Sequence, residues 1–73
     1  MTNGWREVER AGSPHIEAHK LIGGHLYRVF LWPFAAAMVW RQGVWRFLDG
    51  VERFDSLEAG CAAVDRMLAR QAA

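Results

Sequence analysis

The chain has 73 residues, of which 52% are hydrophobic and 23% charged, and nine basic against eight acidic residues leave a net charge of +1. This length and composition indicate one small folded domain and exclude a disordered or multidomain protein. The nearly balanced charge argues against a dedicated nucleic-acid binder, which usually carries a clear basic excess.

The expected location is the cytoplasm. Cys61 is the only cysteine, which excludes an internal disulfide and fits a reducing compartment. The most apolar run, residues 29–40, is too short to cross a bilayer and is interrupted by Pro33. The first ten residues lack the basic-then-apolar order of a secretory signal. We therefore expect a soluble protein that does not associate with membranes.

Residues 1–14 form a polar lead-in that we expect to be partly ordered at most, ahead of a single domain over residues 15–73. Within the lead-in, Trp5 and Val8 fit either one side of a helical turn or a short strand at a sheet edge. The sequence does not separate these two alternatives.

Two turns predict β-hairpins. Gly23-Gly24 and Gln42-Gly43 are two-residue turns flanked by β-favouring residues. The second turn sits inside a near-repeat, Val-Trp-Arg on each side, and places Trp40 opposite Trp45. The expected strands cover about residues 15–22, 25–32, 35–42 and 44–49, of which the last completes a meander of three to four strands.

The register between the two hairpins depends on Pro33, which favours a turn. A two-residue connection, Pro33-Phe34, would place Val29 opposite Met38. One more residue in this loop would flip the register and bring Phe30 and Trp32 to the core side instead.

With the two-residue connection, each face of the sheet has a distinct character, because side chains alternate between faces and opposed residues share one. The expected core face is almost entirely apolar, with Lys20 as an exception; it collects Ile16, Ala18, Ile22, Tyr27, Val29, Leu31, Ala36, Met38, Trp40, Trp45 and Phe47. The expected outer face collects Glu17, His19, Arg28, Phe30, Trp32, Val39, Arg41, Val44 and Arg46.

A C-terminal helix over about residues 56–70 is predicted to pack on the core face, which makes the fold class α+β. Asp55 or Ser56 caps the helix. An apolar stripe at helical spacing follows the cap, and it consists of Leu57, Cys61, Val64 and Leu68. Gly60 within this helix predicts a close approach to the tryptophans of the sheet.

No catalytic, cofactor or metal site is predicted, and we expect a protein that is not an enzyme. His15 and His19 share a strand face but lie roughly 13 Å apart, too far for one metal ion. Cys61 belongs to the apolar helix stripe and is expected to be a core thiol rather than a nucleophile.

The outer face is the one candidate functional surface, and we expect Arg28, Phe30, Trp32, Arg41 and Arg46 to contact a partner there. Arginine and aromatic residues suit a protein interface, either with another protein or in a homodimer. The same residues suit stacking on nucleic-acid bases. A third interpretation is structural: Phe30 and Trp32 would pack against the segment that holds Trp5.

The expected function is therefore a small interaction domain that binds a protein partner or itself, with a nucleic-acid-binding module as the alternative. A small phage or mobile-element inhibitor or accessory protein is a second alternative that fits the size. The sequence GVWRFLDG followed by FDSLEAGCAAVDRML resembles, over the second half of the chain, the sheet-plus-helix DNA-binding domains of tyrosine integrases. Those domains read DNA with a basic sheet, from which the balanced charge departs, and no functional residue is carried over.

Overall fold

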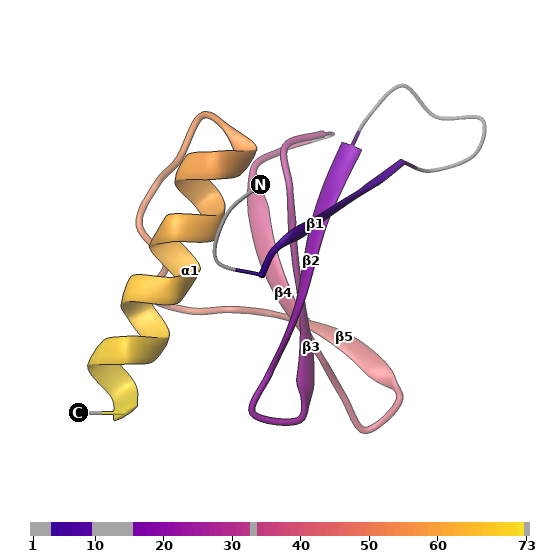
Figure 1. Ribbon diagram of the computed structural model, residues 1–73, viewed down its shortest axis with the longest axis vertical. Helices are drawn as coiled ribbons and strands as arrows, with labels where there is room; N and C mark the ends of the chain where they lie inside the picture. Colours follow the sequence, from indigo (N-terminus) through magenta and orange to yellow (C-terminus); the bar gives the residue numbers. More distant parts are fainter. Residues whose placement is uncertain (1–3, 10–15, 33, 73) are drawn as a thin grey trace.

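A computed structural model describes residues 4–9, 16–32 and 34–72, in which one antiparallel sheet is covered on one face by one helix (Figure 1). The five strands follow one another across the sheet in chain order. They are β1 (Arg6–Glu9), β2 (Ile16–Ile22), β3 (His25–Phe30), β4 (Ala36–Arg41) and β5 (Val44–Phe47), and the helix is α1 (Leu57–Ala72).

This architecture confirms the predicted α+β meander with a C-terminal helix and adds a fifth strand, β1. Of the two alternatives for Trp5 and Val8, the edge strand is right for Val8, and Trp5 lies directly before this strand. His15 and Pro33, for which the sequence predicted a strand position and a turn, lie outside the described residues. In the described part of the chain, α1 falls short of the length and apolarity that a membrane crossing requires.

Both hairpin turns have the predicted geometry. The two central residues of each turn have positive φ, from 52° at Gln42 to 83° at Gly24. This is the type I′ turn, whose twist matches that of the flanking strands. As predicted, Ile22 lies opposite His25 and Trp40 lies opposite Trp45.

The predicted register between β3 and β4 is wrong by one residue. Val29 lies opposite Ala37 rather than Met38, and Phe30 lies opposite Ala36. Because a shift of one residue exchanges the two faces of a strand, every side chain of β4 and β5 lies on the face opposite to the predicted one. The flip of register that a longer loop would cause is therefore realised, but its predicted consequence is wrong: Phe30 stays on the face away from α1 and Trp32 is 56% exposed, whereas β4 and β5 change faces.

The observed register is favoured by the small side chains that it places beneath α1. The core between sheet and helix consists of Trp5, Ala18, Tyr27, Val29, Ala37, Val39, Cys61 and Val64. Gly60 lies so close to the sheet that a Cβ on it would be 2.7 Å from Val29 Cγ1 and from the Phe54 ring. The predicted close approach at Gly60 is confirmed, but it is made to Val29 and Phe54. Trp40 or Trp45 in this layer would hold the helix away from the sheet.

The helix begins as predicted after Ser56, whose hydroxyl oxygen accepts a hydrogen bond from the Ala59 N–H at 3.1 Å. Cys61 and Val64 are buried, and Leu57 and Leu68 pack against the core from its margins. The segment between β5 and α1 is a loop that contributes Val51 and Phe54 to the same core.

Trp5, directly before β1, and Lys20 of β2 are joined to α1 by polar contacts at the margin of the core. Trp5 is buried, and its Nε1 donates a hydrogen bond to Asp65 Oδ2 at 3.0 Å. Lys20 Nζ donates to the other oxygen of Asp65 at 3.1 Å. This contact explains why a lysine lies on the otherwise apolar side of β2: its ammonium reaches the helix carboxylate at the edge of the core.

Candidate interaction surface

The face of the sheet opposite α1, here called the open face, is covered by no helix or strand among the described residues. Strand alternation and the observed register assign its side chains to three rows that run across the strands. The rows are Leu21, Leu26, Trp40 and Trp45; then Arg6, His19, Arg28, Met38 and Phe47; and then Val8, Glu17, Phe30 and Ala36.

The first row is apolar along its whole length and lies next to the two hairpin turns. Leu21 is 69% exposed and Trp40 is 42% exposed. The Trp40 and Trp45 rings meet edge to face with their centroids 5.3 Å apart. Folding therefore leaves a contiguous apolar strip in contact with water, an arrangement that marks interaction surfaces in soluble proteins.

The other end of the open face carries an aromatic cluster outside the core. Phe34, in the connection between β3 and β4, contacts the rings of Phe30 and Phe47 at centroid distances of 5.8 and 6.2 Å. Phe30 is buried in this cluster, whereas Phe34 and Phe47 stay more than half exposed. The open face thus combines buried aromatic side chains that fix its shape with exposed ones that are free to contact a partner.

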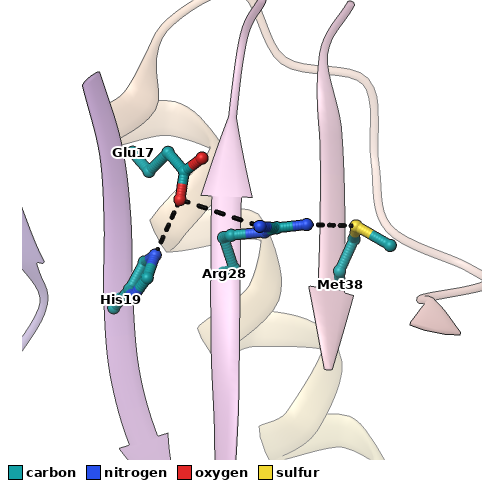
Figure 2. A network of polar contacts seen from close by, with 4 residues as sticks. All are labelled: Glu17, His19, Arg28 and Met38. Atoms are coloured by element: carbon teal, nitrogen blue, oxygen red, sulfur yellow. Dashed lines mark hydrogen bonds and ion pairs between the residues drawn. The ribbon is translucent and has the colours of Figure 1, made fainter. Parts of the chain in front are cut away.

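A buried polar network beside the apolar row joins Glu17, His19, Arg28 and Met38 (Figure 2). Glu17 is only 4% exposed, and its Oε2 lies 2.9 Å from His19 Nε2 and 3.9 Å from Arg28 Nη1. Arg28 Nη2 donates to the sulfur of Met38 at 3.0 Å. The network links three adjacent strands on the side away from α1, and its positive and negative charges compensate each other.

The Arg28 guanidinium is also held by aromatic rings. Its Cζ atom lies 4.3 Å from the centroid of Trp45 and 5.3 Å from that of Phe30. The Arg28 side chain is only 12% exposed. Arg28 therefore acts as a fixed part of the surface, on which Trp45 and Phe30 are oriented, rather than as a mobile surface charge.

The structure does not bring the five predicted partner-binding residues together. Arg28 and Phe30 lie on the open face as predicted, and Trp32 lies in the exposed connection after β3. Arg41 and Arg46 lie on the face that α1 covers, near the C-terminal end of the helix, where they line a hollow with Met67 and Gln71. The one-residue error in the register is the reason, because it inverted β4 and β5.

The same error hid the residues that make up the apolar part of the open face. Met38, Trp40, Trp45 and Phe47 were predicted in the core, and all four lie on the open face. The signal that relates them to one another was present, since the Gln42-Gly43 turn correctly pairs Trp40 with Trp45. What was missing was a signal for the face to which this hairpin belongs.

Cys61 lies in the core, and burial, together with the nearby Asp65 carboxylate, raises the pKa of its thiol to about 11. The thiol is therefore protonated at neutral pH, and a protonated thiol is a poor nucleophile and metal ligand. Within residues 4–9, 16–32 and 34–72, no three histidine, cysteine or acidic side chains converge on a point where a metal ion could bind.

Comparison of the chain with models of protein families, with curated proteins and with solved structures gives no match. The features from which a function can be inferred are therefore the open face and the edges of the sheet.

Proposed function

We propose that this protein is a small interaction domain without catalytic activity, and that its open face binds a protein surface, in the simplest case that of a second copy. The observation that carries the proposal is the uncovered apolar row of Leu21, Leu26, Trp40 and Trp45. Trp40, Phe34 and Phe47 together expose roughly 300 Å² at about 200 Å² per aromatic side chain. These rings lie at the two ends of the open face, and their summed area is close to that of the largest apolar patch on an ordinary monomer, about 300–600 Å², which is often functional.

The positions of the arginines favour a protein partner over a nucleic acid. Arg41 and Arg46 lie on the opposite face, and Arg28 is largely buried beside Glu17. Among the described residues of the open face, Arg6 is the arginine with an exposed position. Nucleic-acid binding depends on several arginine or lysine side chains that reach phosphates from the same surface. An aromatic surface with compensated charge suits a protein interface better.

The test introduces a charge at the centre of the apolar row. Trp40→Glu is expected to abolish self-association, measured by sedimentation velocity over a concentration series, because a carboxylate would be buried in the interface. Ala69→Glu places the same charge on the exposed side of α1 and is the matched control. Its association is expected to equal that of the unmodified chain.

A chain that stays monomeric at all concentrations excludes the second copy as the partner. A photo-crosslinking residue at position 40, compared with one at position 69, then tests for a different protein: adducts at both positions or at neither contradict the proposal. Fluorescence anisotropy with short single- and double-stranded oligonucleotides tests the alternative. Binding at low salt that weakens steeply as salt is added would favour the nucleic-acid-binding module.

A further inference from the structure

The two edges of the sheet differ in their protection against pairing with another strand. In β1, at one edge, the side chains of Arg6, Glu7 and Glu9 are charged and exposed. Charged side chains are a common protection for an edge strand. β5, at the other edge, has the sequence Val-Trp-Arg-Phe, with a single charge and an apolar or aromatic residue at each of its other positions.

The hydrogen bonds of the β4–β5 hairpin determine which backbone groups of β5 point outward. Arg41 and Val44 flank the two-residue turn, and such a pair exchanges backbone hydrogen bonds within the hairpin. Four residues further on, the Leu48 N–H donates to the Ala37 carbonyl at 3.0 Å. Because inward and outward groups alternate along an antiparallel strand, the N–H and C=O groups of Trp45 and Phe47 point away from β4.

Side chains on the two faces of β5 determine what an added strand would meet. Trp45 and Phe47 belong to the open face, and Phe47 is 60% exposed. Arg46 is exposed on the other face, where it lines a hollow with Arg41 and Asp49. With two arginines and one aspartate, the charge on that side of the edge is positive. The edge is therefore aromatic on one side and basic on the other.

We propose that β5 is a docking site for an extended segment of another protein, which adds to the sheet as a sixth strand. This segment carries apolar residues opposite Trp45 and Phe47 and an acidic residue opposite Arg46, because directly opposed side chains share a face. The outward N–H and C=O groups supply the affinity, as in other cases of strand addition. A second copy of β5 fits less well, since in the register centred on Arg46 the two guanidinium groups would oppose each other. The proposal uses the edge of the sheet and does not depend on the function of the open face.

The test uses a nine-residue synthetic peptide in which valine alternates with glutamate, and a control peptide with lysine in place of glutamate. Nuclear magnetic resonance measures amide hydrogen exchange of the full chain with and without each peptide. The glutamate peptide is expected to slow exchange at Trp45 and Phe47, whose N–H groups point outward, and to leave Arg46 unchanged. It is also expected to bind at least about threefold more tightly than the lysine peptide, as a cross-strand charge pair predicts.

Variants separate the edge from the side chains that it carries. Phe47→Pro removes one outward N–H without touching the hairpin hydrogen bonds, and is expected to abolish binding of the glutamate peptide. Phe47→Ala, the matched control, loses the same ring and keeps the N–H, so binding weakens but the exchange pattern persists. Arg46→Glu is expected to reverse the preference between the two peptides.

Several results would overturn the proposal. The first is unchanged amide exchange at Trp45 and Phe47 with saturating glutamate peptide. The second is binding of the glutamate peptide by Phe47→Pro with the same affinity as by the unmodified chain. The third is protection of these amides that rises with protein concentration alone, which would identify a second copy as the occupant. If Phe47→Pro does not fold, the exchange pattern of the unmodified chain still decides. Trp40→Glu, which disrupts the open face, is expected to keep the slowed exchange at Trp45 and Phe47 with the glutamate peptide. A failure of the function proposed for the open face can therefore be distinguished from a failure of strand addition at β5.

Discussion

At the scale of single residues, Arg28 does most to organise the open face. It contacts a carboxylate from β2, a thioether from β4 and two aromatic rings, one from its own strand β3 and one from β5. Since its charge is compensated by Glu17 and its side chain is largely buried, it contributes shape and rigidity more than free charge. The aromatic rings that it holds are therefore presented in a fixed arrangement, which lowers the conformational entropy that an interface has to lose on binding.

The pairing of Arg28 with Glu17 predicts how substitution of these two residues changes the stability of the fold. Glu17→Leu leaves the Arg28 charge in a largely buried position and is expected to destabilise the fold by about 2 kcal/mol. The double variant Glu17→Leu/Arg28→Met replaces both charges with apolar groups and is expected to recover most of this loss, because removing a buried pair together is far less costly than removing one partner. Unfolding in urea, with equal slopes for both variants, measures the difference.

His19→Ala serves as a control for this comparison. It removes a side chain that contacts Glu17 but leaves the Glu17–Arg28 pair intact. We expect it to cost less than Glu17→Leu. If the double variant is as unstable as Glu17→Leu, the uncompensated charge is not the main cause of the loss.

At the scale of elements, the sequence predicts each hairpin but not how the two hairpins join. The turns at Gly23-Gly24 and Gln42-Gly43 require positive φ, and this requirement fixes the pairing on both sides of them. β4 is apolar on both faces, so hydrophobic alternation does not select a register between β3 and β4. The register is selected by the close packing of α1 on small side chains, a tertiary effect that no local pattern reports.

The same difference between well-defined hairpins and an undefined join explains which residues of the candidate site are predicted on the correct face. Arg28 and Phe30 were correctly assigned to the face away from the helix because β2 and β3 are fixed relative to each other by their turn. Arg41 and Arg46 were assigned to the wrong face because their hairpin was inverted as a unit. The predicted surface of arginine and aromatic residues, for which nucleic-acid binding is the alternative function, is therefore divided between two faces.

The packing of α1 makes Gly60→Ala a direct test of the close approach between the helix and the sheet. An alanine in an exposed helix position is favoured over glycine by about 1 kcal/mol. At Gly60, however, the new Cβ would lie 2.7 Å from Val29, which is fully buried, so we expect a net loss of about 1–2 kcal/mol from overpacking. Thermal or urea unfolding measures it. Ala69→Gly, at an exposed position of α1, reports the propensity difference alone, and stabilisation by Gly60→Ala would contradict the close approach.

At the scale of the whole molecule, the N-terminal strand closes a fold that its other elements leave incomplete. β1 covers the edge of β2 with charged side chains, and Trp5 fills the margin of the core beneath α1. The hydrogen bond from Trp5 to Asp65 joins residues 60 positions apart, close to the two ends of the described chain. Stability of the sheet and docking of the helix are thus coupled through a segment that composition alone marks as a polar lead-in.

Because of this coupling, deletion of residues 1–14 tests the domain boundary predicted at residue 15. A chain of residues 15–73 would lose the buried Trp5, and truncation of a buried tryptophan typically costs about 3–5 kcal/mol. A domain of this length has only about 4–11 kcal/mol of stability in total, at roughly 0.05–0.15 kcal/mol per residue. We therefore expect the shortened chain to be marginally folded, with a lower thermal midpoint and weaker near-ultraviolet circular dichroism than the full chain. Trp5→Ala in the full chain isolates the contribution of the indole. If residues 15–73 unfold at the thermal midpoint of the full chain, the lead-in is dispensable and the boundary is right. If the shortened chain loses more stability than Trp5→Ala does, β1 itself stabilises the fold by protecting the edge of β2.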